Sequence, residues 1–167
     1  GTTSMQAEQI QNASTDAVAE TQPSVFSSQF RVYYEDTDAG GIVYHTNYLK
    51  FCERTRTDFV REVLGYSQQK HLQEDKQGFV LAKLRANFMS SAKLEDLLTV
   101  TCVPFHLTRA RLEMYQEIKN EQGKLLFAMC STLAFVDGKT GRPLSIPEEF
   151  KQKLVPHVWT QDPQMFC

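Results

Sequence analysis

The sequence predicts an α+β domain in which one antiparallel sheet wraps around a single long helix. Three observations favour this fold: a short β-prone segment comes first, one amphipathic helical stretch follows, and four segments with two-residue periodicity complete the chain. Short turns join those last segments, which implies antiparallel pairing. The concave face of such a sheet is where a lone helix can bury its apolar stripe.

The chain is expected to hold one domain, over residues 25–155. Residues 1–24 are polar and lack aromatic side chains, so they are interpreted as a flexible tail, and residues 156–167 as a C-terminal extension. The domain opens with a predicted strand over 30–34. An acidic turn over 35–41 follows that strand.

The helical stretch runs from residue 46 to residue 64. Apolar side chains recur there every three or four positions, and charged residues occupy most of the other positions. At ~1.5 Å per residue the helix would be about 27 Å long. Thr46 is its expected N-cap and Gly65 its expected stop, before a polar connection over 66–78.

The period then changes to two, which predicts strands. The one nearest the C-terminus is apolar on both faces, as expected of a central strand. Pro104 requires an edge position or a bulge in its strand. Ser145 and Glu148 have the spacing of a capping box for a short last helix ending at Leu154. The predicted strands are 79–88, 97–107, 111–119 and 125–136.

Composition excludes several classes of function. A formal charge of −2 argues against a nucleic-acid surface, and no apolar stretch approaches the ~18 residues of a membrane span. The four cysteines lack metal-ligand spacing and three sit among apolar neighbours, which favours buried thiols over a disulfide or zinc framework. With no signal peptide in view, a cytoplasmic location is expected.

The stretch around the acidic turn carries the chemistry. Asp36 and Asp38 precede the Gly40–Gly41 pair and then the start of the long helix. The backbone N–H groups of a helix N-terminus have no intrahelical acceptor and lie at the positive end of the dipole. A carboxylate beside such amides suggests acyl chemistry. An Asx turn or a helix cap is the structural alternative for Asp38, and a turn is the favoured role of Asp36.

The phrase at residues 31–48, RVYYEDTDAGGIVYHTNY, resembles the hot-dog-fold acyl-CoA thioesterases. The closest likeness is to the 4-hydroxybenzoyl-CoA thioesterase family, within it the group associated with the bacterial Tol–Pal system, and it covers about residues 28–155. The resemblance implies a hot-dog fold, hydrolysis of short-chain or aromatic acyl-CoA, and no metal or other cofactor. It also implies a homo-oligomer, a dimer of dimers whose sites draw on two chains, and acyl carrier protein as a possible thioester donor.

The resemblance places the catalytic carboxylate at Asp38, as a nucleophile or as the base for a water molecule. His45 and Tyr34 are further catalytic candidates, with strand packing the alternative for Tyr34. Glu53 is an alternative acid, although a solvated ion pair is favoured for it. Expected substrate contacts include amides near His45 and cations for the CoA phosphates: Gly41, Ile42, Val43, Tyr44, Thr46, Lys93 and Arg109.

Two other functions remain open at this stage. One is a hot-dog hydratase or dehydratase. Resemblance to those enzymes would imply an Asp and a His five apart, or a His with an acid across subunits, so the seven-residue separation of Asp38 and His45 disfavours it. The other is a non-catalytic module that binds an acyl group or a protein. For a thioesterase, the depth of the acyl pocket should depend on Phe51, Phe79, Phe88 and Met89.

Overall fold

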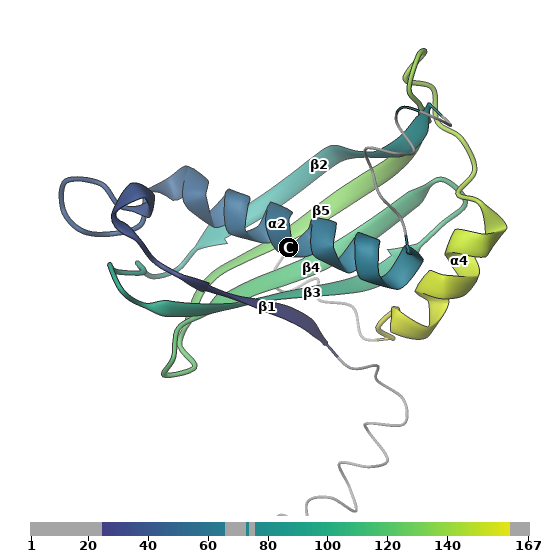
Figure 1. Ribbon diagram of the computed structural model, residues 1–167. Coiled ribbons are helices and arrows are strands. Elements are labelled where there is room, and N and C mark those ends of the chain that lie inside the picture. The colour runs from purple at the N-terminus through teal and green to yellow at the C-terminus, as the bar shows by residue number, and fades with distance from the viewer. Residues whose placement is uncertain (1–24, 66–72, 74–75, 161–167) are drawn as a thin grey trace, which may run out of the picture.

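The computed structural model describes residues 25–65, 73 and 76–160 (Figure 1). Residues 1–24, predicted to be a tail, lie outside this part, as do residues 161–167 of the predicted C-terminal extension and most of the connection after the helix. The described chain forms one antiparallel sheet and one long helix, which confirms the expected hot-dog architecture.

The sheet has five strands in the order β1-β3-β4-β5-β2, and every neighbouring pair is antiparallel. β5 lies between β4 and β2 and is buried along almost its whole length, as its apolar sequence indicated. The bulge anticipated at Pro104 appears as a register shift between Pro104 and His106. The strands are β1 (Phe26–Arg31), β2 (Gln77–Phe88), β3 (Leu97–Leu107), β4 (Arg111–Lys119) and β5 (Leu125–Asp137).

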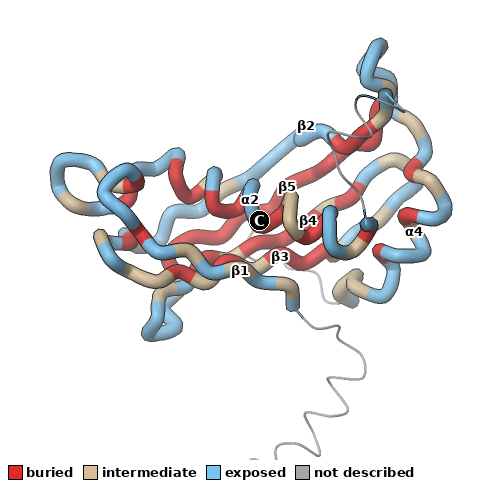
Figure 2. The backbone as a smooth tube through the Cα atoms, viewed as in Figure 1, coloured by how far each residue is buried: buried red, intermediate tan, exposed pale blue. Residues whose placement is uncertain are grey.

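The helix α2 (His45–Leu64) crosses one face of the sheet (Figure 1). Its buried stripe packs on the central strands, which Figure 2 shows as the buried part of the molecule. Gly65 ends the helix with φ 61°, a left-handed conformation that glycine adopts without strain. None of the helices in the described ranges is long and apolar enough to cross a membrane.

The first strand ends earlier than expected. β1 stops at Arg31, and residues 34–36 form a 3₁₀ turn, η1 (Tyr34–Asp36), instead of continuing the strand predicted over 30–34. The reason is a side chain: a carboxylate oxygen of Asp36 accepts the backbone N–H of Tyr33 at 3.0 Å. This contact turns the chain where local β propensity alone would extend it.

The last helix also begins differently from the prediction. α4 (Glu148–Leu154) starts after Pro147, and Ser145 does not cap it. The Ser145 hydroxyl accepts a hydrogen bond from the Arg109 guanidinium at 2.7 Å instead. A further 3₁₀ turn, η2 (Val155–His157), continues past the expected stop.

The cysteines divide into two kinds. Cys52 and Cys102 are free and buried between α2 and the sheet, as expected. Burial raises the pKa of the Cys52 thiol to about 12. Cys130 is disulfide-bonded, which corrects the expectation for that residue. Its side chain packs with Tyr115 and Ala128, in a cluster separate from the core beneath α2.

Candidate active site

A tight turn presents Asp38 just before α2. The Asp38 N–H donates to the Ile42 carbonyl at 2.9 Å, and the Gly41 N–H donates to the Asp38 carbonyl at 3.0 Å. Gly41 has φ +77°, a conformation that a residue with a Cβ rarely adopts. The turn therefore needs the second glycine of the pair at this position.

The Asp38 side chain is held by the same turn. Its Oδ1 accepts the N–H of Gly40 at 2.8 Å, which makes an Asx turn. The residue as a whole remains exposed, and it lines a cavity. Asp38 thus has the structural role of an Asx turn, and this turn fixes its carboxylate beside the cavity.

Asp36 connects this turn to the helix. Its side chain is only 9% exposed, and one oxygen accepts the Asn47 Nδ2 at 3.0 Å while the other accepts the Tyr33 N–H. Its carbonyl accepts the N–H of Tyr44 at 3.0 Å. Asp36 is a turn former, as predicted, and it also sets the position of the first helical turn relative to Asp38.

The helix start leaves backbone amides available. α2 begins at His45, one residue before the expected start, and the N-cap Tyr44 makes no side-chain capping bond. Thr46 lies inside the first turn, so the prediction of Thr46 as N-cap is wrong. Asn47 donates its N–H to Tyr44. The N–H groups of His45 and Thr46 precede any possible intrahelical acceptor, at the positive end of the dipole.

Asp38 and His45 line one cavity of about 180 Å³, which we call the Asp38 pocket. The chain after β2 forms its other side, because Val43 donates to the Ala92 carbonyl at 2.9 Å and Leu94 donates to the Gly41 carbonyl at 3.2 Å. The full lining is Asp38, Ile42, Val43, His45, Tyr48, Phe88, Met89, Ser90 and Ser91.

The floor of the Asp38 pocket is aromatic. The Phe88 ring lies 5.3 Å from the His45 ring and 5.0 Å from that of Phe127, centroid to centroid, and Tyr48 stacks on Phe127 at 5.3 Å. The Tyr48 hydroxyl accepts the N–H of Ala92 at 2.9 Å. Burial raises the pKa of Tyr48, so the hydroxyl stays neutral and fixes the pocket wall.

Several of these residues carry no site signal in the sequence. Tyr48 belongs by its spacing to the apolar stripe of α2, and Ser90 and Ser91 follow a strand end without any motif. Of the four residues expected to set pocket depth, Phe51 and Phe79 are buried in the core, and Phe88 and Met89 line the pocket. Polar residues directly after an apolar strand were the available signal.

Other predicted residues lie around the Asp38 pocket or away from it. The Tyr34 side chain is 81% exposed and is not part of the lining. Lys93 forms a β-bridge with Ile42, next to the pocket wall. Glu53 accepts the Thr57 hydroxyl at 3.1 Å and lines a different groove farther along α2. Its expected ion pair with a neighbouring arginine is not found among the described residues.

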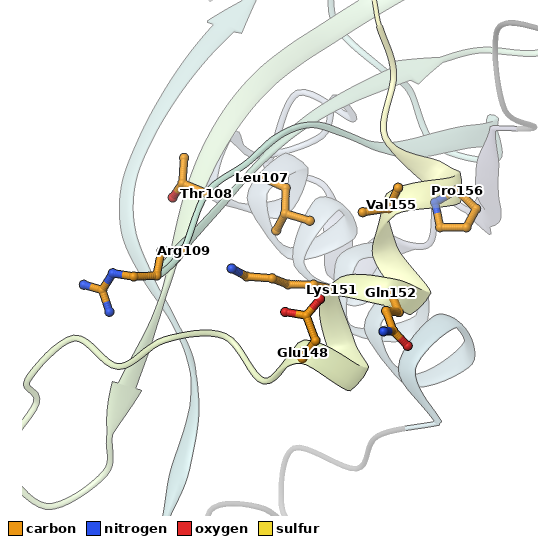
Figure 3. Close-up of a pocket in the computed structure, with 8 residues that line it drawn as sticks. All are labelled: Leu107, Thr108, Arg109, Glu148, Lys151, Gln152, Val155 and Pro156. Carbon is orange, nitrogen blue, oxygen red and sulfur yellow. The ribbon is translucent and has the colours of Figure 1, made fainter.

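Arg109 belongs to a separate cavity of about 520 Å³, between the turn after β3 and α4 (Figure 3). Lys151 extends across it toward Thr108 and Arg109, while the guanidinium of Arg109 points away from Lys151. Because α4 packs near the C-terminal end of α2, where Lys153 bonds the Leu64 carbonyl at 3.3 Å, this cavity lies at the opposite end of the helix from Asp38. One chain does not bring Arg109 and Asp38 together.

No group of three or more His, Cys, Asp or Glu side chains within the described ranges could hold a metal ion. The titratable groups of the Asp38 pocket are Asp38, His45 and the neutral Tyr48. The lining combines Asp38, whose carboxylate is fixed by its turn, with His45, the first residue of α2, so the amides of the helix start lie next to the pocket. These groups suit attack on a polarised carbonyl.

Comparison with known proteins extends this picture. The family model of the thioesterase-like superfamily matches residues 32–154. The acyl-CoA thioesterase YbgC of Haemophilus influenzae is 40% identical over 126 residues, which are 75% of this chain and 91% of that protein. The protein of the same name from Helicobacter pylori is 37% identical over 133 residues, 74% of this chain and 96% of the relative. A probable thioesterase from Bartonella henselae superimposes with a TM-score of 0.68 at 31% identity, covering 74% of this chain and all of that one.

Proposed function

The chain belongs to the thioesterase-like superfamily and is a thioester hydrolase, and on that premise we propose that it cleaves acyl-CoA in the Asp38 pocket. The observation that carries the proposal is the convergence of the Asp38 carboxylate, the His45 side chain and the start of α2 on one cavity. The Asp38 pocket, at about 180 Å³, is smaller than the sites of about 300–1,000 Å³ that hold drug-sized ligands, so it suits a short-chain or aromatic acyl group.

Two chemical routes fit a carboxylate in this position. In the first, an Asp38 oxygen attacks the thioester carbon, the carbon–sulfur bond breaks, and CoA leaves as a thiolate that takes up a proton. Water then hydrolyses the resulting mixed anhydride and restores Asp38. In the second, Asp38 accepts a proton from a water molecule that attacks the same carbon, and that proton passes to the departing sulfur.

In both routes negative charge develops on the carbonyl oxygen. The free N–H groups of His45 and Thr46 are fixed at the helix start, and they would stabilise that charge without reorganising. The imidazole of His45, on the same turn, would orient the thioester or the water. Tyr34 would act only if a second chain or the substrate covers its exposed ring.

The decisive variant is Asp38→Asn, with Glu35→Gln as the matched control, because Glu35 is an exposed carboxylate near the pocket but outside its lining. Free thiol released from acetyl-, butyryl-, octanoyl- and benzoyl-CoA, and from one acyl carrier protein thioester, gives kcat/KM. We expect Asp38→Asn to lose about 10²–10⁴-fold while still binding CoA. Near-normal turnover by this variant would refute the role of Asp38, and inactivity of the wild type on every thioester would favour a binding module.

Single turnover in ¹⁸O-labelled water tests for the anhydride. Label recovered in the Asp38 carboxylate supports the anhydride, because water that attacks the Asp38 carbon of the anhydride leaves its oxygen there. Attack by activated water places label in the released acid alone, so label in Asp38 would contradict that route.

We also propose that the protein is a homo-oligomer joined along β2, and that it is a dimer of dimers. β2 is an edge strand, and it carries large apolar side chains that are 39–50% exposed, Leu81, Leu84 and Phe88 among them. Long apolar edges of this kind are usually paired or covered. Leu81→Arg should lower the molar mass in light scattering, whereas Gln29→Arg on the other edge strand should not. An unchanged mass in Leu81→Arg would place the interface elsewhere.

Lys93 remains our candidate for a CoA phosphate contact within one chain, because it is exposed beside the Asp38 pocket. A phosphate contact by Arg109 would have to come from a second copy, since α2, with its 20 residues at ~1.5 Å each, separates Arg109 from Asp38 in the same chain.

A further inference from the structure

The Asp38 pocket has an apolar neighbour on the same side of the sheet. A groove of about 290 Å³ lies between α2 and β2, and we call it the Arg56 groove. Its walls combine four apolar side chains with three charged residues of α2: Leu49, Leu81, Leu84 and Met129, with Lys50, Glu53 and Arg56. Tyr48, in the Asp38 pocket, and Leu49, in the groove, are consecutive on α2.

The inner face of β2 runs from one cavity to the other. Phe88 pairs with Phe127, Ala86 with Met129 and Leu84 with Ser131, so after the bulge near Lys83 every second side chain faces α2. Phe88 lines the Asp38 pocket and Leu84 lines the Arg56 groove. Ala86 stands between them with only a methyl group.

Phe88 is therefore the bulky side chain at this boundary. Its ring makes edge-to-face contacts with His45, Tyr48 and Phe127, yet the residue is 50% exposed. The Tyr48–Phe127 stack beneath it belongs to the main core. Removing the Phe88 ring would consequently open space above a floor that stays in place.

We propose that Phe88 determines acyl-chain specificity by separating the Asp38 pocket from the Arg56 groove. This inference rests on the proposed thioesterase function and adds its selectivity. With the Phe88 ring present, an acyl chain that extends from the thioester carbon meets the aromatic floor of the Asp38 pocket after a few carbons. Without it, a longer chain can pass over Ala86 and lie against Leu84 and Met129.

The test compares the wild type with Phe88→Ala, Phe88→Leu and the double variant Phe88→Ala/Ala86→Leu on acyl-CoA thioesters from acetyl to decanoyl. The readout is the ratio of kcat/KM for octanoyl-CoA to that for butyryl-CoA. Because one methylene in an apolar pocket changes specificity about 10–200-fold, we expect Phe88→Ala to raise this ratio at least about 10-fold. Phe88→Leu should fall between, and the added leucine side chain at position 86 should reverse the gain.

Val80→Ala is the matched control, because Val80 is a similarly exposed apolar residue of β2 and lines none of the three cavities described. Circular dichroism and light scattering establish that each variant is folded and assembled. If Phe88→Ala is not folded, the ratio measured for Phe88→Leu decides the test. The proposal is overturned if a folded Phe88 variant has the wild-type octanoyl-to-butyryl ratio, or if the raised ratio of Phe88→Ala persists when Ala86→Leu is added. In both cases the proposed thioesterase function is unaffected. A wild type without thioesterase activity overturns both.

Discussion

The buried contact between Asp36 and Asn47 allows a sharp test of how the site is held. In Asp36→Asn, one of the two carboxylate oxygens becomes an NH₂ group. That group must face either the Asn47 amide or the Tyr33 N–H, and both are donors at 3.0 Å in the wild type. One hydrogen bond to a charged acceptor is lost, and a buried donor is left unpaired.

The magnitude follows from that count. A hydrogen bond to a charged group is worth about 1.5–3 kcal/mol, so we expect Asp36→Asn to lower the free energy of unfolding by about 2 kcal/mol. For a chain of 167 residues this corresponds to a fall in Tm of roughly 4–8 °C. Asn47→Asp alone should cost at least as much, because it places two carboxylates together in a buried site.

The assay is urea unfolding of both single variants and of the swap Asp36→Asn/Asn47→Asp. The swap exchanges donor and acceptor, so it should recover about 2 kcal/mol relative to the sum of the singles. Glu35→Gln removes a neighbouring exposed carboxylate and should stay within about 0.5 kcal/mol of the wild type. Additive costs in the swap, or a stable Asp36→Asn, would refute the reasoning.

Three further results are expected. Tyr48→Phe removes the hydroxyl that accepts the Ala92 N–H, which should cost about 1–3 kcal/mol in urea unfolding, and no cost would mean that water replaces the hydroxyl. Gly41→Ala should cost about 1 kcal/mol by the same measurement from backbone strain alone, because no atom lies within 4 Å of the position that its Cβ would take. The Cys52 thiol should resist thiol reagents in the native state, and because its pKa rises from 9.0 to about 12 on folding, its contribution to stability should be lost as the pH rises between these values. Rapid native-state labelling of Cys52 at pH 8 would contradict that burial.

The parts of the fold that the sequence predicted are those with strong periodicity. α2 follows from its apolar stripe and Gly65, and β4 and β5 follow from alternation and from an uninterrupted apolar run. The predictions failed at element ends, where a polar side chain forms a hydrogen bond that the local sequence pattern does not reveal. The Asp36 carboxylate accepts the Tyr33 N–H and so ends β1 early. The Ser145 hydroxyl accepts a hydrogen bond from Arg109 instead of capping α4.

The candidate site divides in the same way. Asp38, Ile42, Val43 and His45 are close together in the sequence, and the structure brings these four to the lining of one pocket. The residues over 88–91 join them only because the segment around Ala92 pairs with the one around Val43. Such a pairing between distant segments leaves no local pattern. Phe88 and Met89 could therefore be predicted as pocket residues but not placed opposite Asp38, and the signal for Ser90 and Ser91 is limited to their position directly after an apolar strand.

One consequence of this arrangement concerns how the protein can change over evolutionary time. The groups proposed for bond cleavage, and the Asp36 anchor that positions them, come from a single short stretch of chain. The wall that an acyl group would meet comes from the end of β2 and the residues after it. Mutations in the second stretch can therefore change which thioesters are accepted while the reactive groups stay the same. Descendants of one ancestor could diverge in substrate specificity and keep one reaction mechanism.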